Sequence, residues 1–183
     1  MEVIAIVGMA GAGKSEAARL FEESGFKRIR FGDITDEEIE KQGLELNEEN
    51  ERRVREQLRK KYGMEAYAIL SLSRIDLTLK QKPVVIDGLY SWEEYKFLKK
   101  YYRGGLRVVA VWASPRTRYD RLAHRDIRPL KPEEAAGRDE AEIKNINKSG
   151  PIAMADYTII NEATLKDLKK EVRKAIAFLR ERE

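Results

Sequence analysis

The sequence predicts an α/β fold in which one parallel β-sheet is covered by helices on both faces. Short, continuous apolar runs recur along the chain, as in parallel strands that are buried on both faces. Stretches with helical spacing separate these runs, and neither repeats nor low-complexity linkers interrupt the alternation. Right-handed crossovers through the helices would then join neighbouring parallel strands into a single sheet.

Two expected strands and a long helical region make up the first half of the chain. Residues 2–7 (EVIAIV) and 26–31 (FKRIRF) are the strands, and the helical stretch between them stops at Gly25. Residues from about 34 to 80 are polar and helical, with a capping box in TDEE and a charged helix that ends at Gly63. Since no strand is expected there, we interpret this region as a helical insert that lies over the core.

The second half supplies three more strands, at residues 83–88, 106–113 and 155–161, so five are expected. The helices between them carry start signals. Residues 91–94 (SWEE) form a capping box, and Ser114 followed by Pro115 gives a cap and a favourable first helical residue. An amphipathic helix that follows Thr164 completes the alternation.

One domain with two appendages accounts for the length of the chain. A sequence of 183 residues, 42% of them hydrophobic, suits a single domain with a sizeable core. Residues of about 126–150 combine two prolines with a second charged helix, which is typical of a mobile lid and not of a core element. The expected domain, residues 1–183, therefore consists of a core, the helical insert and this lid.

Charge and cysteine content exclude several classes of protein. The 36 basic and 32 acidic side chains leave a net charge of +4 with the signs interleaved, which indicates a solvated surface and gives little support for nucleic-acid binding. Cysteine is absent, so disulfides and cysteine-ligated zinc are excluded. No apolar run approaches the roughly 20 residues of a membrane span, and no charged leader precedes the first strand. We expect a cytoplasmic location without a membrane partner, whereas the oligomeric state stays open.

Residues 8–15 (GMAGAGKS) carry the strongest motif. Gly8 is followed by four residues and then by Gly13-Lys14-Ser15, between a strand and a helix, which is the spacing and context of a phosphate-binding loop, or P-loop. Its backbone amides and the helix N-terminus favour phosphate oxygens, Lys14 would reach the outer phosphates, and Ser15 would coordinate magnesium. We expect ATP and Mg²⁺ as ligands. The residues expected to contact the nucleotide are Gly8, Ala10, Gly11, Ala12, Gly13, Lys14, Ser15 and Glu16.

Two aspartates follow expected strands. Asp87 ends the strand VVID, which we expect beside the first strand, and it could hold magnesium through water at the edge where open α/β sheets bind ligands. Asp33 follows RIRF at the same edge, where it could accept a proton from an acceptor hydroxyl or orient the acceptor. Simpler interpretations remain, since Asp87 could only end its strand and Asp33 could only cap a helix.

Arginines concentrate in and before the lid. Arg118, Arg121 and Arg125 recur at spacings of three and four, which predicts one helical face, and Arg128 and Arg138 follow. Arginines that close over a transferred phosphoryl group stabilise its charge and exclude water, which separates a kinase from a wasteful ATPase. The plainer alternative is a solvated charged helix face.

Taken together, the motifs resemble the dephospho-CoA kinases and the adenylate kinases, and most closely a group of archaeal P-loop proteins related to both. The resemblance covers nearly the whole chain and rests on IVGMAGAGKS, FGD, GLELNEEN, LRKKYGMEA, VVIDG, ASPRTRYDRLAHR, GRDEAEI and ADYTIINEATLKDL. It implies a P-loop nucleotide-kinase fold with five parallel strands, an acceptor-binding insert and an arginine-bearing lid.

The resemblance also assigns roles to single residues. Arg121, Arg125 and Arg138 would embrace the donor phosphates. Asp33 matches the acidic residue proposed as the general base in dephospho-CoA kinases, and Asn161 falls in the turn that wraps the donor adenine. With Lys14, the expected catalytic residues are Asp33, Arg125 and Arg138.

Two departures bear on the acceptor. Asp36 and Tyr90 stand where the archaeal group usually has arginines that would suit an acceptor phosphate. Arg52, Arg53 or Arg74 could substitute for them. Tyr90 itself, or the neighbouring Trp92, could instead pack in the core or stack on an acceptor base.

An acceptor phosphate needs no general base near neutral pH, whereas an alcohol benefits from a carboxylate within hydrogen-bond reach. A retained Asp33 without those arginines therefore favours a hydroxyl acceptor. The expected function is ATP-dependent phosphoryl transfer to a nucleotide-like small molecule, of the dephospho-CoA kinase type. A nucleoside monophosphate kinase is the alternative, and a nucleotide-binding regulatory switch with weak hydrolysis is the alternative of another class.

Overall fold

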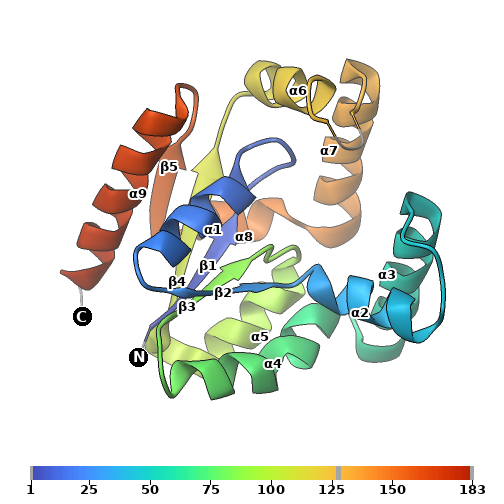
Figure 1. Ribbon diagram of the computed structural model, residues 1–183, viewed down its shortest axis with the longest axis horizontal. Helices are drawn as coiled ribbons and strands as arrows, with labels where there is room; N and C mark the ends of the chain where they lie inside the picture. Colours follow the sequence, from blue (N-terminus) through green and yellow to red (C-terminus); the bar gives the residue numbers. More distant parts are fainter. Residues whose placement is uncertain (1, 127–128, 182–183) are drawn as a thin grey trace.

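The computed structural model describes residues 2–126 and 129–181, and its five strands form one parallel sheet (Figure 1). The strands are β1 (Val3–Val7), β2 (Lys27–Arg30), β3 (Val84–Asp87), β4 (Leu106–Trp112) and β5 (Tyr157–Ile160). Their order across the sheet is β2-β3-β1-β4-β5, with every neighbouring pair parallel. The predicted fold class is confirmed, as is the position of β3 beside β1.

The described helices alternate with the strands as the sequence predicts. They are α1 (Lys14–Glu23), α2 (Asp33–Lys41), α3 (Glu48–Tyr62), α4 (Ala66–Leu79), α5 (Trp92–Tyr102), α6 (Pro115–Ala123), α7 (Pro132–Ile146), α8 (Ser149–Ala153) and α9 (Leu165–Arg180), with a 3₁₀ turn at Arg103–Gly105. The start signals at two helices are confirmed. Ser91 and Glu94 form the capping box of α5, and Ser114 caps α6 ahead of Pro115.

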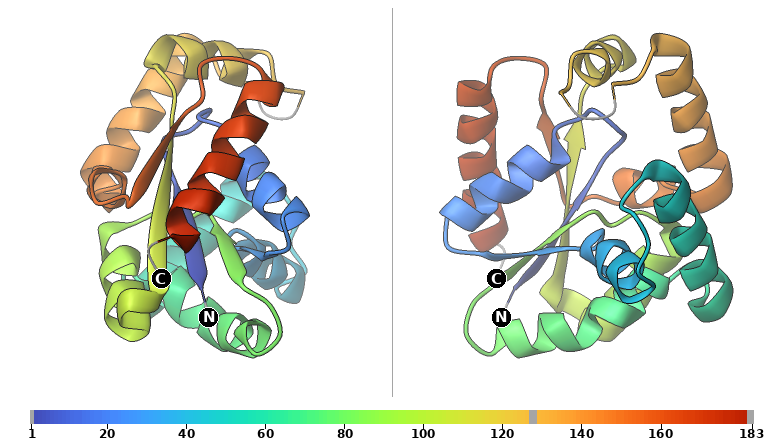
Figure 2. Two further views of the ribbon diagram at one scale, coloured as in Figure 1. Left: turned by 90° about the vertical axis from the view of Figure 1, so that its left-hand side faces the viewer. Right: turned by 45° about the vertical axis from the view of Figure 1, so that its right-hand side comes forward.

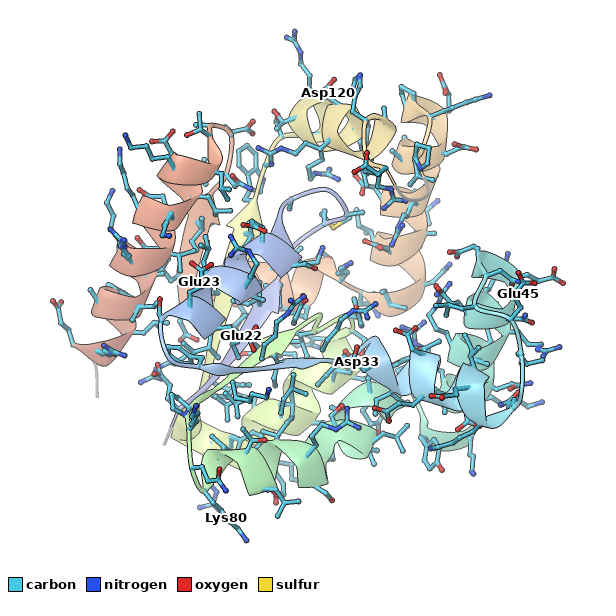
Figure 3. All side chains as sticks on the ribbon, in the orientation of Figure 1. Glu22, Glu23, Asp33, Glu45, Lys80 and Asp120 are labelled. Atoms are coloured by element: carbon cyan, nitrogen blue, oxygen red, sulfur yellow. The ribbon has the colours of Figure 1, made fainter. Side chains whose placement is uncertain are left out.

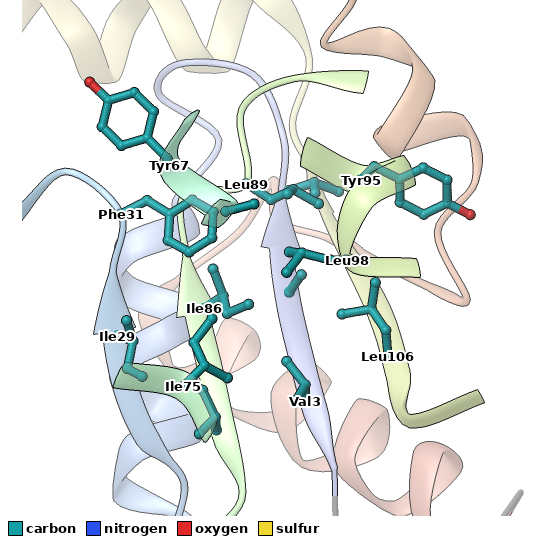
Figure 4. Packing of buried hydrophobic residues seen from close by; sticks show 14 of the residues in the cluster. Val3, Ile29, Phe31, Tyr67, Ile75, Ile86, Leu89, Tyr95, Leu98 and Leu106 are labelled. Atoms are coloured by element: carbon teal, nitrogen blue, oxygen red, sulfur yellow. The ribbon is translucent and has the colours of Figure 1, made fainter. Parts of the chain in front are cut away.

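Two buried clusters, one on each face of the sheet, hold the layers together. On one face α1 and α9 cover β1 and β4 through side chains such as Phe21, Ile4 and Val172 (Figure 2). On the other face α4 and α5 pack through a cluster that includes Phe31, Tyr67 and Leu98 (Figure 4). A parallel sheet covered in this way explains why its central strands are continuously apolar.

The insert expected over residues 34–80 divides into two parts. Helix α4 is a covering helix of the sheet, because Ala66, Tyr67 and Ile75 are buried in the same cluster as the strands. Of the insert, α2 and α3 are the helices that extend beyond the sheet (Figure 1). The highly charged sequence of α3 hid this division, because its charged residues continue into the more apolar α4 without a long linker.

Within the expected lid, α7 is the main described element, and it packs against α6. Ile127 and Arg128 lie outside the described residues, so the structure places neither of them. None of the described helices is both long and apolar enough to cross a membrane.

A buried ion pair joins the lid to the core. The Arg118 guanidinium donates two hydrogen bonds to the Asp139 carboxylate, from Nη1 to Oδ1 at 2.9 Å and from Nη2 to Oδ2 at 2.6 Å. Their side chains are only 6% and 11% exposed. Arg118 also donates from Nε to the Ala113 carbonyl and from Nη1 to the Ala10 carbonyl, each at 3.1 Å. One side chain on α6 therefore connects α7, the end of β4 and the P-loop.

Removing one partner of this pair should destabilise the protein strongly, because the other charge would stay buried without compensation. We expect Asp139→Asn to lose about 3–5 kcal/mol of the free energy of unfolding. Urea unfolding followed by circular dichroism measures the loss. The matched control is Glu140→Gln, which breaks an exposed pair with Lys144 on the same helix and should leave the unfolding midpoint unchanged. Equal stability of the two variants would contradict the role of the buried pair.

Candidate active site

The P-loop has a backbone that only glycine accommodates. Gly8, Gly11 and Gly13 have φ angles of 146°, 77° and 96°, a region that residues with a Cβ rarely adopt. A Cβ on Gly8 would lie 2.3 Å from the Val111 carbonyl oxygen, and one on Gly13 would lie 2.4 Å from Nδ2 of Asn161. The glycine spacing in the sequence thus reflects both conformation and close packing.

Side chains bind the carbonyls of this loop. Lys14 Nζ donates to Met9 at 2.9 Å, Arg118 Nη1 to Ala10 at 3.1 Å, and Asn161 Nδ2 to Ala12 at 2.8 Å. Two of these three carbonyls, those of Ala10 and Ala12, are held from elements far away in the sequence. These side-chain hydrogen bonds stabilise the loop conformation without the help of a ligand.

Asn161, which we expected at the donor adenine, lies at the end of β5 beside the P-loop. Its side chain is 6% exposed and engaged with the Ala12 carbonyl, while its backbone amide donates to Trp112 at 2.7 Å. The structure thus gives the side chain a partner in the P-loop. Contact with the donor adenine stays a proposal, and it would involve the turn around Asn161 instead of this side chain.

Ser15, Asp87 and Arg28 form a second group at the first turn of α1. Ser15 Oγ donates to Asp87 Oδ1 at 3.4 Å. Arg28 donates to the other oxygen, Oδ2, from Nε at 3.1 Å and also from Nη2. The sequence pointed to Ser15 and Asp87 but missed Arg28. The signal was available only in the strand register, which pairs Arg30 with Asp87 and so puts Arg28 one pleat away on the same face.

This group is compatible with magnesium. No set of three or more His, Cys, Asp or Glu side chains within the described ranges could hold a metal ion by itself. Protein-bound Mg²⁺ commonly uses one or two carboxylates and takes its other ligands from substrate phosphates and water. A hydroxyl and a single carboxylate beside a P-loop fit that requirement.

The Lys14 ammonium is buried near other positive charges. Burial, and then the charge of Lys148, lowers the pKa of the Lys14 ammonium to about 7, against smaller opposing effects of Glu142 and Asp87. Lys148 is itself 2% exposed, and its Nζ lies 2.7 Å from Oε2 of Glu142, whose Oε1 accepts from Arg138 Nε at 3.2 Å. Glu142 is therefore the shared counter-ion of a cation cluster defined by Lys14, Lys148 and Arg138.

The two aspartates near α2 share one arginine. Arg30 Nη1 donates to Asp33 Oδ1 and to Asp36 Oδ2, each at 3.0 Å. Asp33 lies at the start of α2, after β2, as expected (Figure 3). Arg30 holds it with a charge-assisted bond, which sequence reasoning did not find.

A cleft of about 760 Å³ separates the insert from the lid. It is lined by Arg30, Gly32, Thr35, Asp36, Glu48, Glu51, Arg52, Arg55, Arg59, Tyr67, Tyr90, Arg125, Leu130, Glu134, Arg138, Ala141, Glu142, Asn145 and Ile146. Glu142 links this cleft to Lys14, since it lines the cleft and acts on the Lys14 charge.

The lining of the cleft indicates which arginines could substitute for those absent at positions 36 and 90. Of the three possible substitutes, Arg52 lines the cleft, Arg53 is not among the lining residues, and Arg74 pairs with Glu37 at 2.7 Å. Three arginines that the sequence analysis did not name also line the cleft, namely Arg30, Arg55 and Arg59. Their approach depends on how α3 packs, which a single sequence does not reveal.

Arg59 stands out among them. Its Nε is buried and has no hydrogen-bond partner in the described structure. The guanidinium carbon lies 5.7 Å from the centre of the Tyr67 ring. A buried donor without a partner beside a cleft is a candidate for contact with an anion.

The lid arginines do not share one helical face. Helix α6 ends at Ala123, so Arg125 lies beyond it, and Arg118 is occupied in the buried ion pair. Arg125 nevertheless lines the cleft, as does Arg138 from α7. The expectation of a single face was wrong because the helix ends two residues before Arg125.

Arg121 is on α6 and has a buried Nη1 without a partner among the described residues. The expected contact with a donor phosphate would satisfy this atom. That contact stays a proposal.

Tyr90 lines the cleft, whereas Trp92 stacks on Tyr95 with ring centres 5.0 Å apart. The turn that carries Tyr90 is fixed by the fully buried Glu94, whose Oε2 accepts from the amides of Tyr90 at 2.7 Å and Ser91 at 3.2 Å. Burial raises the pKa of Glu94 to about 7. Tyr90 is thus the aromatic residue of the pair that could meet an acceptor.

Comparison with known proteins places the chain in a family. A family model described as "AAA domain" matches residues 4–145. A UPF0200 protein of Thermococcus kodakarensis is 36% identical over 178 residues, which cover 95% of this chain and 96% of the relative. The chain therefore belongs to the AAA domain family of P-loop proteins and is similar to archaeal UPF0200 proteins.

Solved structures share the fold at low identity. A gluconokinase from Sinorhizobium meliloti has a TM-score of 0.64 and 18% identity, with 99% of this chain and 94% of that chain covered. Shikimate kinase from Acinetobacter baumannii in complex with shikimate has a TM-score of 0.61 and 16% identity, with 100% and 95% covered. These likenesses confirm the kinase-type P-loop fold.

The lowered pKa of Lys14 makes a prediction about stability. The folded protein releases the Lys14 proton near pH 7, whereas the unfolded chain keeps it to about pH 10.5, so this group makes the free energy of unfolding rise with pH between those values. Replacement of the ammonium by an apolar group removes this contribution. We expect Lys14→Met to be more stable than the wild type below pH 7, with the difference shrinking toward pH 9.

Thermal unfolding at several pH values between 6 and 9, without nucleotide, measures the difference. Lys144→Met, on the exposed side of α7, serves as the matched control and should differ from the wild type by the same amount throughout. A constant difference for Lys14→Met as well would show that Lys14 titrates normally.

Proposed function

We propose that this member of the AAA domain family is an ATP-dependent phosphotransferase that moves the γ-phosphoryl group to a nucleotide-like small molecule. The arginine-rich cleft between insert and lid, linked to Lys14 through Glu142, is the observation that carries the proposal. Its volume suits a nucleotide-sized acceptor, and arginines recognise anionic groups through paired donors. The fold shared with a gluconokinase and a shikimate kinase supports the class of reaction by likeness.

On the donor side, the residues proposed to act are Lys14 and two arginines that line the cleft. Lys14 would contact the outer phosphates, and Arg125 and Arg138 at the cleft would stabilise charge on the phosphoryl group during transfer. Mg²⁺, held through Ser15 and Asp87, would supply charge neutralisation at the phosphate oxygens.

Water exclusion completes the argument for transfer over hydrolysis. The Arg118–Asp139 pair fixes α7 beside α6, and Arg118 also binds the Ala10 carbonyl, so the lid helix is connected to the P-loop. An acceptor that fills the cleft would then displace water from the γ-phosphate.

On the acceptor side we propose a hydroxyl group, as in dephospho-CoA kinases. Asp33 would accept the hydroxyl proton, and its hydrogen bond to Arg30, which lines the cleft, orients the carboxylate. A nucleoside monophosphate is the second candidate. It is favoured by one observation, the arginines that α3 brings to the cleft, because these could hold an acceptor phosphate.

The proposal predicts acceptor-dependent consumption of ATP. We expect one acceptor from a panel of dephospho-CoA, nucleoside monophosphates, nucleosides, gluconate and shikimate to accelerate ADP formation with Mg²⁺ and to gain a phosphate. Lys14→Ala should abolish turnover. Asp33→Asn should lower kcat by roughly 10²–10⁴-fold for a hydroxyl acceptor and far less for a phosphate acceptor.

Coupled detection of ADP and mass spectrometry of the acceptor measure this outcome. If ATP binds but no acceptor stimulates turnover, the kinase proposal is wrong. The regulatory-switch class then becomes the interpretation to pursue, with the α2–α3 insert as the surface for a protein partner.

Arg59 provides a test of acceptor binding. If its buried Nε contacts an anionic group of the acceptor, Arg59→Met should raise KM for the acceptor by roughly 10- to 100-fold, since hydrogen bonds to charged groups contribute about 1.5–3 kcal/mol. The KM for ATP should change little. Lys60→Met, its exposed neighbour on α3, is the control, and steady-state kinetics with both substrates varied measures the effect. An unchanged acceptor KM would remove Arg59 from the site.

A further inference from the structure

Arg28 has no role in the phosphoryl transfer described above, yet it binds the carboxylate expected to serve magnesium. We propose that Arg28 is a positioning residue that occupies Asp87 as an internal counter-ion, so that Mg²⁺ enters the site only together with a nucleotide. This inference rests on the proposed nucleotide site and concerns how that site is loaded.

The geometry divides the Asp87 carboxylate between two partners. Arg28 directs both Nε and Nη2 to Oδ2, and Ser15 Oγ approaches Oδ1 at 3.4 Å. Each oxygen has its own partner, which fixes the rotation of the carboxylate. Oδ1 is the oxygen on the P-loop side, where it accepts from Ser15, the residue expected to bind the metal.

The strand register explains how Arg28 reaches Asp87. Strands β2 and β3 are parallel, with Arg28 opposite Val85 and Arg30 opposite Asp87. Residues two apart on a strand share a face, so Arg28 and Arg30 both lie on the α1 side, where their side chains separate. Arg28 extends along the strand to Asp87, while Arg30 turns to Asp33 and Asp36.

Burial makes this counter-ion necessary. The Asp87 side chain is 5% exposed, and that of Arg28 is 26% exposed. A buried carboxylate without a partner would be costly, so Asp87 needs either a cation or a proton. Arg28 supplies the cation permanently, because a guanidinium stays charged at all physiological pH values.

A neutralised carboxylate has little attraction for free Mg²⁺. The Arg28–Asp87 pair has no net charge. The charge of Arg28 also acts on Glu16, on the first turn of α1, because together with the dominant effect of Arg19 it lowers the pKa of the Glu16 carboxyl. Mg²⁺ gives up its hydration water reluctantly and takes several ligands from substrate phosphates. Only a bound triphosphate would add the oxygens and the negative charge that the ion requires.

We therefore expect free Mg²⁺ to leave the stability of the protein unchanged unless Arg28 is removed. We expect the melting temperature of the wild type to be the same in EDTA and in millimolar MgCl₂ when no nucleotide is present. Arg28→Met should melt roughly 5 °C lower in EDTA, because Asp87 loses its partner, and MgCl₂ should restore most of the loss. Lys27→Met, an exposed neighbour on β2, is the control for strand propensity and should show no response to magnesium.

A second variant separates the metal effect from a general weakening of the sheet. In Arg28→Met/Asp87→Asn the buried charge is gone, so the response to MgCl₂ should disappear. If Arg28→Met does not fold, Arg28→Gln removes the charge but keeps an amide donor for Asp87, and it should show the same stabilisation by MgCl₂. Stabilisation of the wild type by MgCl₂ alone, or a lack of response in both Arg28 variants, would overturn the proposal.

The test also distinguishes this inference from the proposed function. Unfolding with MgCl₂ and without nucleotide requires no turnover and no acceptor. Calorimetric titration of the wild type with ATP and MgCl₂ separately tests whether the P-loop binds nucleotide. Failure to bind ATP would contradict the proposed function, while recovery of Arg28→Met by magnesium would still show that Arg28 keeps the ion from Asp87.

Discussion

The buried contact of Arg118 with Asp139 is the interaction on which the arrangement of this protein depends. One guanidinium joins the lid helix α7, the end of β4 and the Ala10 carbonyl of the P-loop. A group with five fixed donors can do this because several acceptors converge around it in one plane. The position of the lid relative to the P-loop is thereby set by a folded core contact and does not depend on flexible surface charges.

Charge compensation is the common theme around the P-loop. Glu142 neutralises Lys148 and Arg138, and Arg28 neutralises Asp87. These partners are internal, so the charges can be buried without a ligand. A nucleotide with its metal would exchange some of these contacts for its own. The lowered pKa of Lys14 shows that its buried positive charge is only partly compensated, so an anionic ligand would stabilise that charge.

The cleft between the insert and the lid has a different character, since its lining combines acidic side chains with several arginines. Arginines from α3 and from the lid both line it, and Tyr67 and Tyr90 provide aromatic surface. Such a lining suits a ligand that carries both an anionic group and a flat or polar body. The lining also includes arginines of α3, although Asp36 and Tyr90 stand where the resembled group has arginines.

The sequence by itself determined the fold class, the five strands, the P-loop and the place of Asp87 beside Ser15. These features depend on local periodicity, on glycine spacing and on the position of a residue at the end of its strand, all of which short stretches of chain encode. Only the tertiary structure decided that α4 belongs to the core, that α6 ends before Arg125, and that Arg118 is a structural residue. It alone brought Arg28 to Asp87 and Arg59 to the cleft. The physical reason is that long charged side chains find their partners across elements, through packing and register that no local pattern specifies.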